Sequence, residues 1–187
     1  MGKGLALGAL ATLAGLAAAL YCLAARGLLP AHADAPPPRL EKWLAQKALN
    51  AAIARHMPKG DNPVAPIDEN VLAGLKLYAA NCAVCHGAAD GKPSAIASGL
   101  YQKAPQFARY GVEDDEDGAV YWQVAHGIRM TGMPAFGGSL SEPQIWQIVL
   151  FLKSMDSLSP AVEKAWRAVP SVAPADAKYL VKKESDR

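Results

Sequence analysis

The sequence predicts an all-α fold, and three observations support this. Residues 4–25 form an uncharged stretch rich in Ala and Leu. Later segments around 39–56, 68–82 and 141–155 repeat apolar residues at steps of three and four, which is the spacing of an amphipathic helix. No part of the chain has the pattern of a βαβ unit. With 187 residues in all, we expect one domain with appendages.

The first apolar stretch, Gly4 to Ala25, is long enough to cross a membrane, because a spanning helix needs about 20 apolar residues. The apolar region of a secretory signal is shorter, about 7–15 residues. A small-residue cleavage motif, Ala31-His32-Ala33, nevertheless precedes Asp34. Two outcomes are therefore expected: an uncleaved membrane anchor, which the length favours, or a signal peptide removed near Ala33.

The next segment links this stretch to the main domain. Residues 35–38, Ala-Pro-Pro-Pro, predict a stiff extended spacer. From Arg39 to His56 a helical pattern follows, in which Leu40, Trp43 and Leu44 alternate with basic residues. Such a helix either lies on a membrane surface or packs against the domain or a partner subunit, and the pattern does not separate the two.

Two helices frame the main domain. The first is predicted to begin near Asp68, with Asp68 or Asn70 as its N-cap, and it carries Gly74 in its interior. Because glycine costs about 1 kcal/mol relative to alanine inside a helix, Gly74 predicts a close crossing with another helix. The last helix is predicted to begin at Ser141, where Ser141 and Gln144 match a capping box.

Charge is distributed unevenly along the chain. Residues 61–158 hold 6 Lys or Arg and 11 Asp or Glu, so the flanks are basic within a chain of net charge +2. A basic flank suits anionic lipid, an acidic domain attracts basic partner surfaces, and no nucleic-acid partner is expected.

An acidic loop leads into a predicted helix over 118–127. The tail predicts one short helix at 160–168 and no ordered structure after Pro170.

Cys82-Ala83-Val84-Cys85-His86 is the strongest functional signal in the chain. The pattern C-x-x-C-H is the attachment signature of a c-type haem. The two thiols add to the vinyl groups of one porphyrin as thioethers, and the adjacent histidine binds the iron. A zinc site would need about four ligands, yet the other histidines are scattered singly. A redox dithiol would accompany a βαβ pattern. We therefore expect one haem c, attached through Cys82 and Cys85, with His86 as proximal ligand.

A second axial ligand is expected from the loop 129–138, which is rich in Gly and Pro. A methionine thioether is neutral and soft, so it favours ferrous iron and raises the reduction potential. Met133 stands between a glycine and a proline that shape the loop, and we expect it to bind the iron rather than Met130. A ligand from His126 is the alternative, which would give a bis-histidine site.

With these motifs, Gly74-x-x-x-Tyr78 and the closing helix 145–152 make residues 66–158 resemble the class I monohaem cytochromes c of bacteria. The resemblance implies an all-α fold wrapped around one covalent haem. It implies that the first and last helices cross where Gly74 and Tyr78 meet Trp146 or Phe151, which would explain a glycine inside the first helix.

The resemblance also implies details of the haem site. The proximal His86 is expected to donate its free N–H to a backbone carbonyl near Pro93 or Pro105. Arg129 is expected to pair with a haem propionate, because a guanidinium matches a carboxylate well. Filled axial positions imply a single-electron carrier and not an enzyme.

Several partners are compatible with this function. The expected ones are respiratory or periplasmic redox proteins such as a quinol-oxidising complex, a dehydrogenase or a terminal oxidase. The alternative function is that of an electron-accepting haem subunit of a periplasmic dehydrogenase complex. A gas-sensing or catalytic haem would require an open iron site.

The domain plan follows from these expectations. It places an anchor or signal at 1–26, a Pro-rich linker with a helix at 27–60, the haem domain at 61–158 and a tail at 159–187. Family members receive their haem outside the bacterial cytoplasm. The anchored form would therefore cross the inner membrane once, through residues 4–25, with its haem domain in the periplasm. The cleaved form would be soluble in the periplasm.

Overall fold

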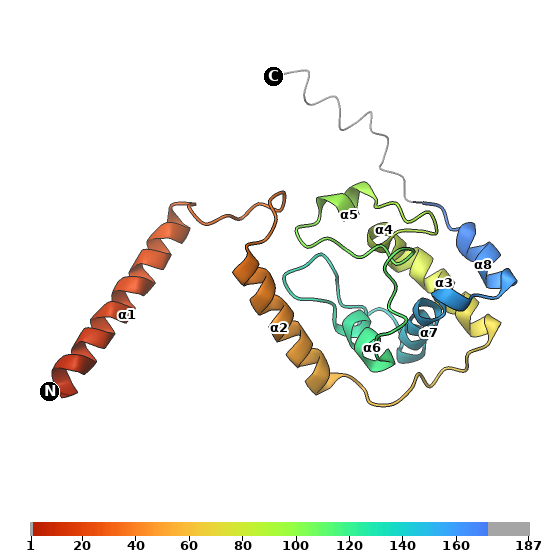
Figure 1. Cartoon of the computed structure of the whole chain (residues 1–187), viewed down its shortest axis with the longest axis horizontal. Helices are drawn as coiled ribbons and strands as arrows, with labels where there is room; N and C mark the ends of the chain where they lie inside the picture. Colours follow the sequence, from red (N-terminus) through yellow and green to blue (C-terminus); the bar gives the residue numbers. More distant parts are fainter. Residues whose placement is uncertain (1, 172–187) are drawn as a thin grey trace, which may run out of the picture. The chain divides into compact units, whose positions relative to one another are not determined.

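The computed structural model describes residues 2–171, and within that range it contains helices and no strands. The expected all-α fold is therefore confirmed. The chain divides into two compact units, one ending at His32 and one beginning at Ala33. The expectation for the tail after Pro170 lies almost wholly outside the described residues. In chain order (Figure 1) the helices are α1 Gly2–Ala25, α2 Arg39–His56, α3 Asp68–Asn81, α4 Ala83–His86, α5 Ala95–Gly99, α6 Asp117–His126, α7 Glu142–Lys153, the 3₁₀ helix η1 Met155–Ser157, and α8 Pro160–Arg167.

The first unit is built on one apolar helix. Helix α1 has 24 residues, and at 1.5 Å per residue it is about 36 Å long. The hydrocarbon core of a bilayer is about 30 Å thick. The stretch Lys3–Ala25 has a mean hydropathy of 2.0, so by length and composition it qualifies as a membrane span.

The core of the second unit lies where α3 crosses α7. A Cβ atom placed on Gly74 would lie 1.9 Å from the backbone oxygen of Gln147, so only glycine allows the two helices to come this close. The rings of Tyr78 and Phe151, both fully buried, lie 5.4 Å apart at the same crossing. Of the two aromatic partners that the resemblance implied, Phe151 is the one found here. Trp146 stacks instead on Tyr121 of α6.

The helix ends show one expectation confirmed and one corrected. Ser141 and Gln144 form the predicted capping box at the start of α7. The predicted cap of α3 is wrong, because its N-cap is Ile67, without a side-chain hydrogen bond. The Asp68 carboxylate accepts a hydrogen bond from the Ser159 hydroxyl instead. A residue far along the chain thus binds the Asp68 carboxylate, which a local N-cap would have required.

Helix α2 packs against α6 within the second unit, and the segment after it is bound at several points. The backbone N–H of Asn62 donates to the Asp117 carboxylate at 3.0 Å, and the Asn62 side-chain amide donates to the Trp146 carbonyl at 2.9 Å. At the other end of α2, Tyr101 donates its hydroxyl hydrogen to Glu41 at 2.9 Å. One face of α2 therefore packs on the domain, as one of the two alternatives for this helix required.

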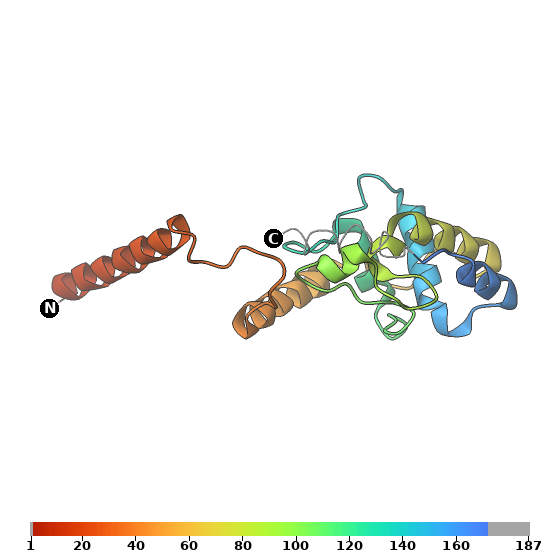
Figure 2. The same cartoon turned by 90° about the horizontal axis from the view of Figure 1, so that it is seen from above.

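Helix α8 lies against α3, as two views at right angles show (Figures 1 and 2). Its residues Val162 and Trp166 are buried in the same hydrophobic cluster as Tyr78. The Trp166 ring meets the Tyr78 ring edge-on, with centroids 5.6 Å apart. This helix lies beyond residue 158, where the sequence placed the end of the haem domain, and we propose that the domain extends through α8.

Candidate functional site

The C-x-x-C-H motif forms a single helical turn. Cys82 caps the end of α3, and its carbonyl accepts hydrogen bonds from the backbone N–H groups of Cys85 at 3.0 Å and His86 at 2.9 Å. Gly87 then ends the turn at a φ of 83°, a conformation that favours glycine. The two thiols and the imidazole thus come from one short turn, which consists of α4 and its N-cap Cys82.

Both thiols are unpaired and half-buried. Burial, and secondarily the neighbouring Cys85, raises the pKa of Cys82 to about 12, and burial also raises the pKa of Cys85. A dithiol enzyme needs the opposite, a cysteine whose pKa is lowered so that the thiolate forms near neutral pH. The environment of the two cysteines therefore argues against thioredoxin-like chemistry and favours their use for haem attachment.

The imidazole of His86 is held by its backbone surroundings. Its Nδ1 lies 3.0 Å from the carbonyl oxygen of Pro105, and the ring of Phe107 stacks on it with centroids 4.4 Å apart. Of the two prolines that the resemblance left open, Pro105 carries the acceptor. When Nδ1–H donates to that carbonyl, Nε2 keeps its lone pair for a metal. Burial lowers the pKa of His86 more than the Pro105 hydrogen bond raises it, which favours the neutral, ligating form.

Tyr78 connects the turn to the core. The Tyr78 hydroxyl donates to the Gly87 carbonyl at 2.7 Å, and the whole side chain is buried. Burial, with a smaller contribution from Cys82, raises the pKa of Tyr78, so its hydroxyl remains a donor. The packing of α3 on α7 and α8 therefore sets the position of the haem-attachment turn.

Two side chains that the sequence did not single out also hold this turn. The Gln106 amide donates to the carbonyl of Cys85 at 3.0 Å, and the Ser94 hydroxyl donates to the carbonyl of Val84. Both residues lie in irregular segments, where periodicity carries no signal. The only sequence hint is their proximity to Pro93 and Pro105, which were already considered as carriers of the acceptor.

The Met133 loop is braced from within. It begins at Gly127, where a Cβ atom would lie 2.7 Å from the Met133 carbonyl oxygen. That oxygen accepts a hydrogen bond from the N–H of Ile128 at 3.2 Å. The hydroxyl of Thr131 accepts from the N–H of Met133 at 3.1 Å and donates to the carbonyl of Ile128 at 2.7 Å. These contacts close the loop into a compact bend.

The two loop methionines differ in their surroundings. Met133 is half-buried and packs against the hydrophobic core cluster, to which Cys82 is also packed. Met130 is 86% exposed and adopts a φ of 63°. Arg129 is exposed on the same loop. His126 is exposed at the end of α6, with its ring 5.1 Å from that of Trp122. Of these four side chains, Met133 has the surroundings of an interior ligand.

The donor set fits a haem better than a bare ion. Among residues 2–171, no three His, Cys, Asp or Glu side chains converge as a metal site would require. Two thiols, a neutral imidazole oriented by Pro105 and a half-buried thioether match the covalent and axial needs of a haem c. The side chain of Leu100 packs closely against the Met133 loop. A Cβ atom placed on Gly132 of that loop would lie 2.4 Å from Leu100 Cδ2.

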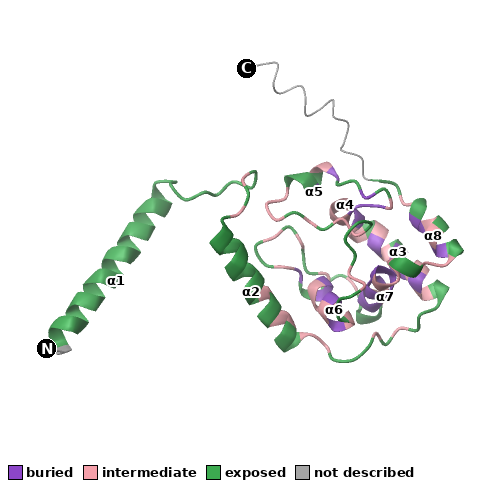
Figure 3. Ribbon diagram, viewed as in Figure 1, coloured by how far each residue is buried: buried purple, intermediate pink, exposed green. Residues whose placement is uncertain are grey.

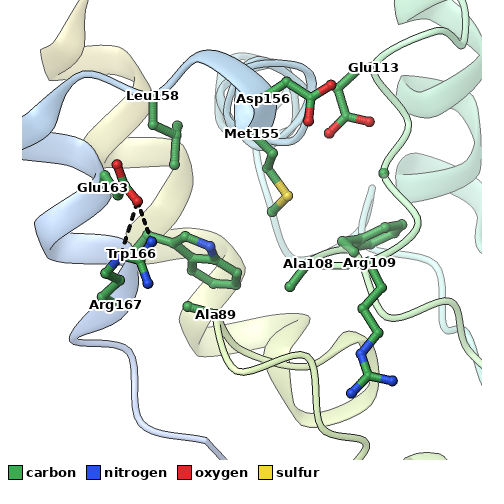
Figure 4. Close-up of a pocket in the computed structure, with 12 residues that line it drawn as sticks. Ala89, Ala108, Arg109, Glu113, Met155, Asp156, Leu158, Glu163, Trp166 and Arg167 are labelled. Atoms are coloured by element: carbon green, nitrogen blue, oxygen red, sulfur yellow. Dashed lines mark hydrogen bonds and ion pairs between the residues drawn. The ribbon is translucent and has the colours of Figure 1, made fainter.

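A separate cavity of about 360 Å³ lies beside α8 (Figure 4). Phe107 and Trp166 are among its lining residues, as are Glu163 and Arg167, which form an ion pair with 2.5 Å between the charged atoms. Neither the C-x-x-C-H side chains nor Met133 lines it. This cavity is therefore distinct from the haem-attachment site.

Part of the chain is similar in sequence to known proteins. Residues 69–152 match the family model for cytochrome c oxidase, cbb3-type, subunit III. The chain is similar to cytochrome c6 of Limnospira maxima, with 33% identity over 99 residues, which is 52% of this chain and 99% of that protein. It is also similar to cytochrome c6 of a Synechococcus species, at 31% identity over 88 residues, covering 47% of this chain and 72% of the relative. The segments holding α1, α2 and α8 lie outside the family match.

Proposed function

The chain belongs to the class I monohaem c-type cytochromes and is a haem c electron carrier, and we propose that His86 and Met133 are the two axial ligands of its iron. The observation that carries this proposal is the 3.0 Å contact between His86 Nδ1 and the Pro105 carbonyl oxygen, which would leave the other ring nitrogen available to bind the iron. The burial contrast between Met133 and Met130 supports the choice of the distal ligand.

The haem, attached through Cys82 and Cys85, supplies a one-electron iron couple. The protein's part is positioning. Pro105 and Phe107 orient the imidazole of His86, while the Thr131 hydrogen bonds hold the backbone of Met133. As a ligand, the neutral thioether of Met133 would raise the reduction potential by favouring the ferrous state. The same hydrogen bonds would limit the movement of Met133 when the iron changes oxidation state.

Two finer assignments follow from the same proposal. Arg129 pairs with a haem propionate, since an exposed guanidinium on the ligand loop suits a carboxylate at the haem edge. The protein is not an enzyme, because ligands from His86 and Met133 would leave no coordination position for a substrate.

Electron-carrier members of the family act with redox protein partners. The match to a family named for an oxidase subunit supports a terminal oxidase as one such partner.

The optical spectrum of the haem-loaded protein tests the ligation. We expect the oxidised protein to show the far-red band of a thioether–iron bond, and the spectrum of the reduced protein to stay unchanged under carbon monoxide. Rapid carbon monoxide binding would show an open iron site and contradict the proposal. It would bring forward the gas-sensing or catalytic haem instead.

We propose that α1 is an uncleaved anchor in the inner membrane, with the haem domain in the periplasm. Its length and mean hydropathy of 2.0 support a span. We expect the mature protein to begin at Met1 or Gly2 and to stay with the membrane after an alkaline carbonate wash. A mature protein that begins at Asp34 and washes off would show cleavage after Ala33 and a soluble periplasmic carrier.

A further inference from the structure

The helix α2 has two unlike faces. Leu49 and Ile53 of its C-terminal half, with Met57 just after its end, lie opposite Ala119 and Gln123 of α6. The first three are half-buried. Figure 3 shows the remainder of α2 as almost wholly exposed. The contacts of Glu41 with Tyr101 and of Asn62 with Asp117 fasten the ends of this segment to the domain. The inner face of α2 is therefore directed toward the domain.

The outer face is apolar and uncovered within the described part of the chain. Leu40 is 72% exposed, and Trp43 and Leu44 are each 59% exposed. At 100° per residue, these three side chains lie on the side of α2 opposite to Leu49. A tryptophan and two leucines in one exposed helical patch are uncommon for a surface that faces water alone.

The charges beside this patch are nearly all positive. Arg39 and Lys47 flank it on α2, and Arg55 lies on the same side further along the helix; all three are exposed. The fourth basic residue, Lys42, points to the side of Leu49. The one acidic residue of the helix, Glu41, accepts the hydrogen bond from Tyr101. Residues 61–158 carry an excess of acidic side chains, so α2 offers a basic, apolar surface on an otherwise acidic domain. An anionic lipid surface attracts basic residues.

We propose that the outer face of α2 lies on an anionic phospholipid bilayer, with Trp43 at the interface between headgroups and acyl chains. This inference rests on the proposed anchor. The segment 26–38 reaches at most about 45 Å when extended, so α2 starts close to any bilayer that α1 spans. This tether raises the local concentration of the face at the lipid surface, so weak contacts suffice for binding.

The consequence is a fixed orientation of the haem domain. Because α2 packs on α6 and is fastened at Glu41 and Asn62, lipid contact through Leu40, Trp43 and Leu44 orients the whole domain relative to the membrane. An anchored carrier with a free tether would present its haem edge in every direction. This face instead holds one side of the domain toward the lipid and leaves the others for partners.

Spin labels on the full-length haem-loaded protein test the inference. Cys22 is replaced by alanine so that only an introduced thiol reacts, and Leu44→Cys carries the label on the proposed contact face. Lys76→Cys, at an exposed position of α3, is the control for water exposure. Leu13→Cys, within α1, reports the anchor separately. Each protein, with its haem iron reduced, is placed in phosphatidylcholine vesicles with and without phosphatidylserine. The collision rates of the spin label with oxygen and with a nickel chelate are then compared.

In phosphatidylserine vesicles we expect the label at position 44 to show several-fold less collision with the nickel chelate than the label at position 76. The protection should weaken in phosphatidylcholine alone and disappear when Arg39→Glu and Lys47→Glu are added. A position-44 label as open to nickel as position 76 would overturn the inference. So would a position-44 label protected from oxygen as well as from nickel, which would indicate a second copy or a protein partner, because oxygen concentrates among acyl chains and is excluded from a protein contact. If the position-13 label collides freely with the nickel chelate while the position-44 label is protected, the anchor proposal fails and the lipid contact of α2 does not.

Discussion

Replacing Met133 with alanine is expected to abolish the far-red thioether band and to open the reduced haem to carbon monoxide. The reduction potential should fall by on the order of 0.1 V, within the roughly 0.8 V that axial ligands span across haem proteins. The reason is the loss of a soft, neutral ligand that favours ferrous iron. The fold should persist, because Met133 is only half-buried and lies in a loop. Optical spectra and a redox titration measure both effects.

Met130→Ala is the matched control for this change. Met130 lies in the same loop but is 86% exposed, so its loss should leave the band, the carbon monoxide response and the potential unchanged. If the band survives in Met133→Ala and vanishes in Met130→Ala, the two methionines exchange roles. If neither change affects the spectrum, the distal ligand is another group, and His126→Ala would test the bis-histidine alternative.

Replacing Gly74 with alanine is expected to destabilise the protein, although alanine is ordinarily better than glycine inside a helix by about 1 kcal/mol. The added Cβ would lie 1.9 Å from the carbonyl oxygen and 2.6 Å from the carbonyl carbon of Gln147. These atoms belong to the backbone of α7 and yield only if the two helices move apart. Overpacking of this kind costs about 1–3 kcal/mol or more, which offsets the helix gain and reverses its sign.

Urea unfolding of the haem-loaded protein measures this effect, with a lower midpoint as the expected result. Gly99→Ala is the control, since Gly99 ends α5 and no atom lies within 4 Å of its Cβ position. That variant should unfold at the wild-type urea concentration or slightly above it. A stabilised Gly74→Ala protein would show that α3 and α7 are not in close contact at this position.

Part of the architecture could be predicted from local sequence. The bounds of α2 agree with the predicted helix, because amphipathic spacing over a long segment is a strong signal. The start of α7 was predicted from Ser141 and Gln144, because a capping box is a contact between residues three positions apart. The N-cap of α3 could not be predicted in this way, since the side-chain oxygens of Asp68 and Asn70 accept hydrogen bonds from the distant residues Ser159 and Gln147.

The haem site likewise combines features that local sequence predicts with features that depend on distant contacts. By itself the sequence determined the class of cofactor, because thiols and imidazole at fixed offsets in Cys82–His86 must share one turn of chain. Only the tertiary structure decided which carbonyl orients His86, that Phe107 stacks on it, and that Tyr78 and Gln106 hold the turn in place. Those contacts join segments from separate parts of the chain. Sequence periodicity describes one segment at a time, whereas packing brings the segments together.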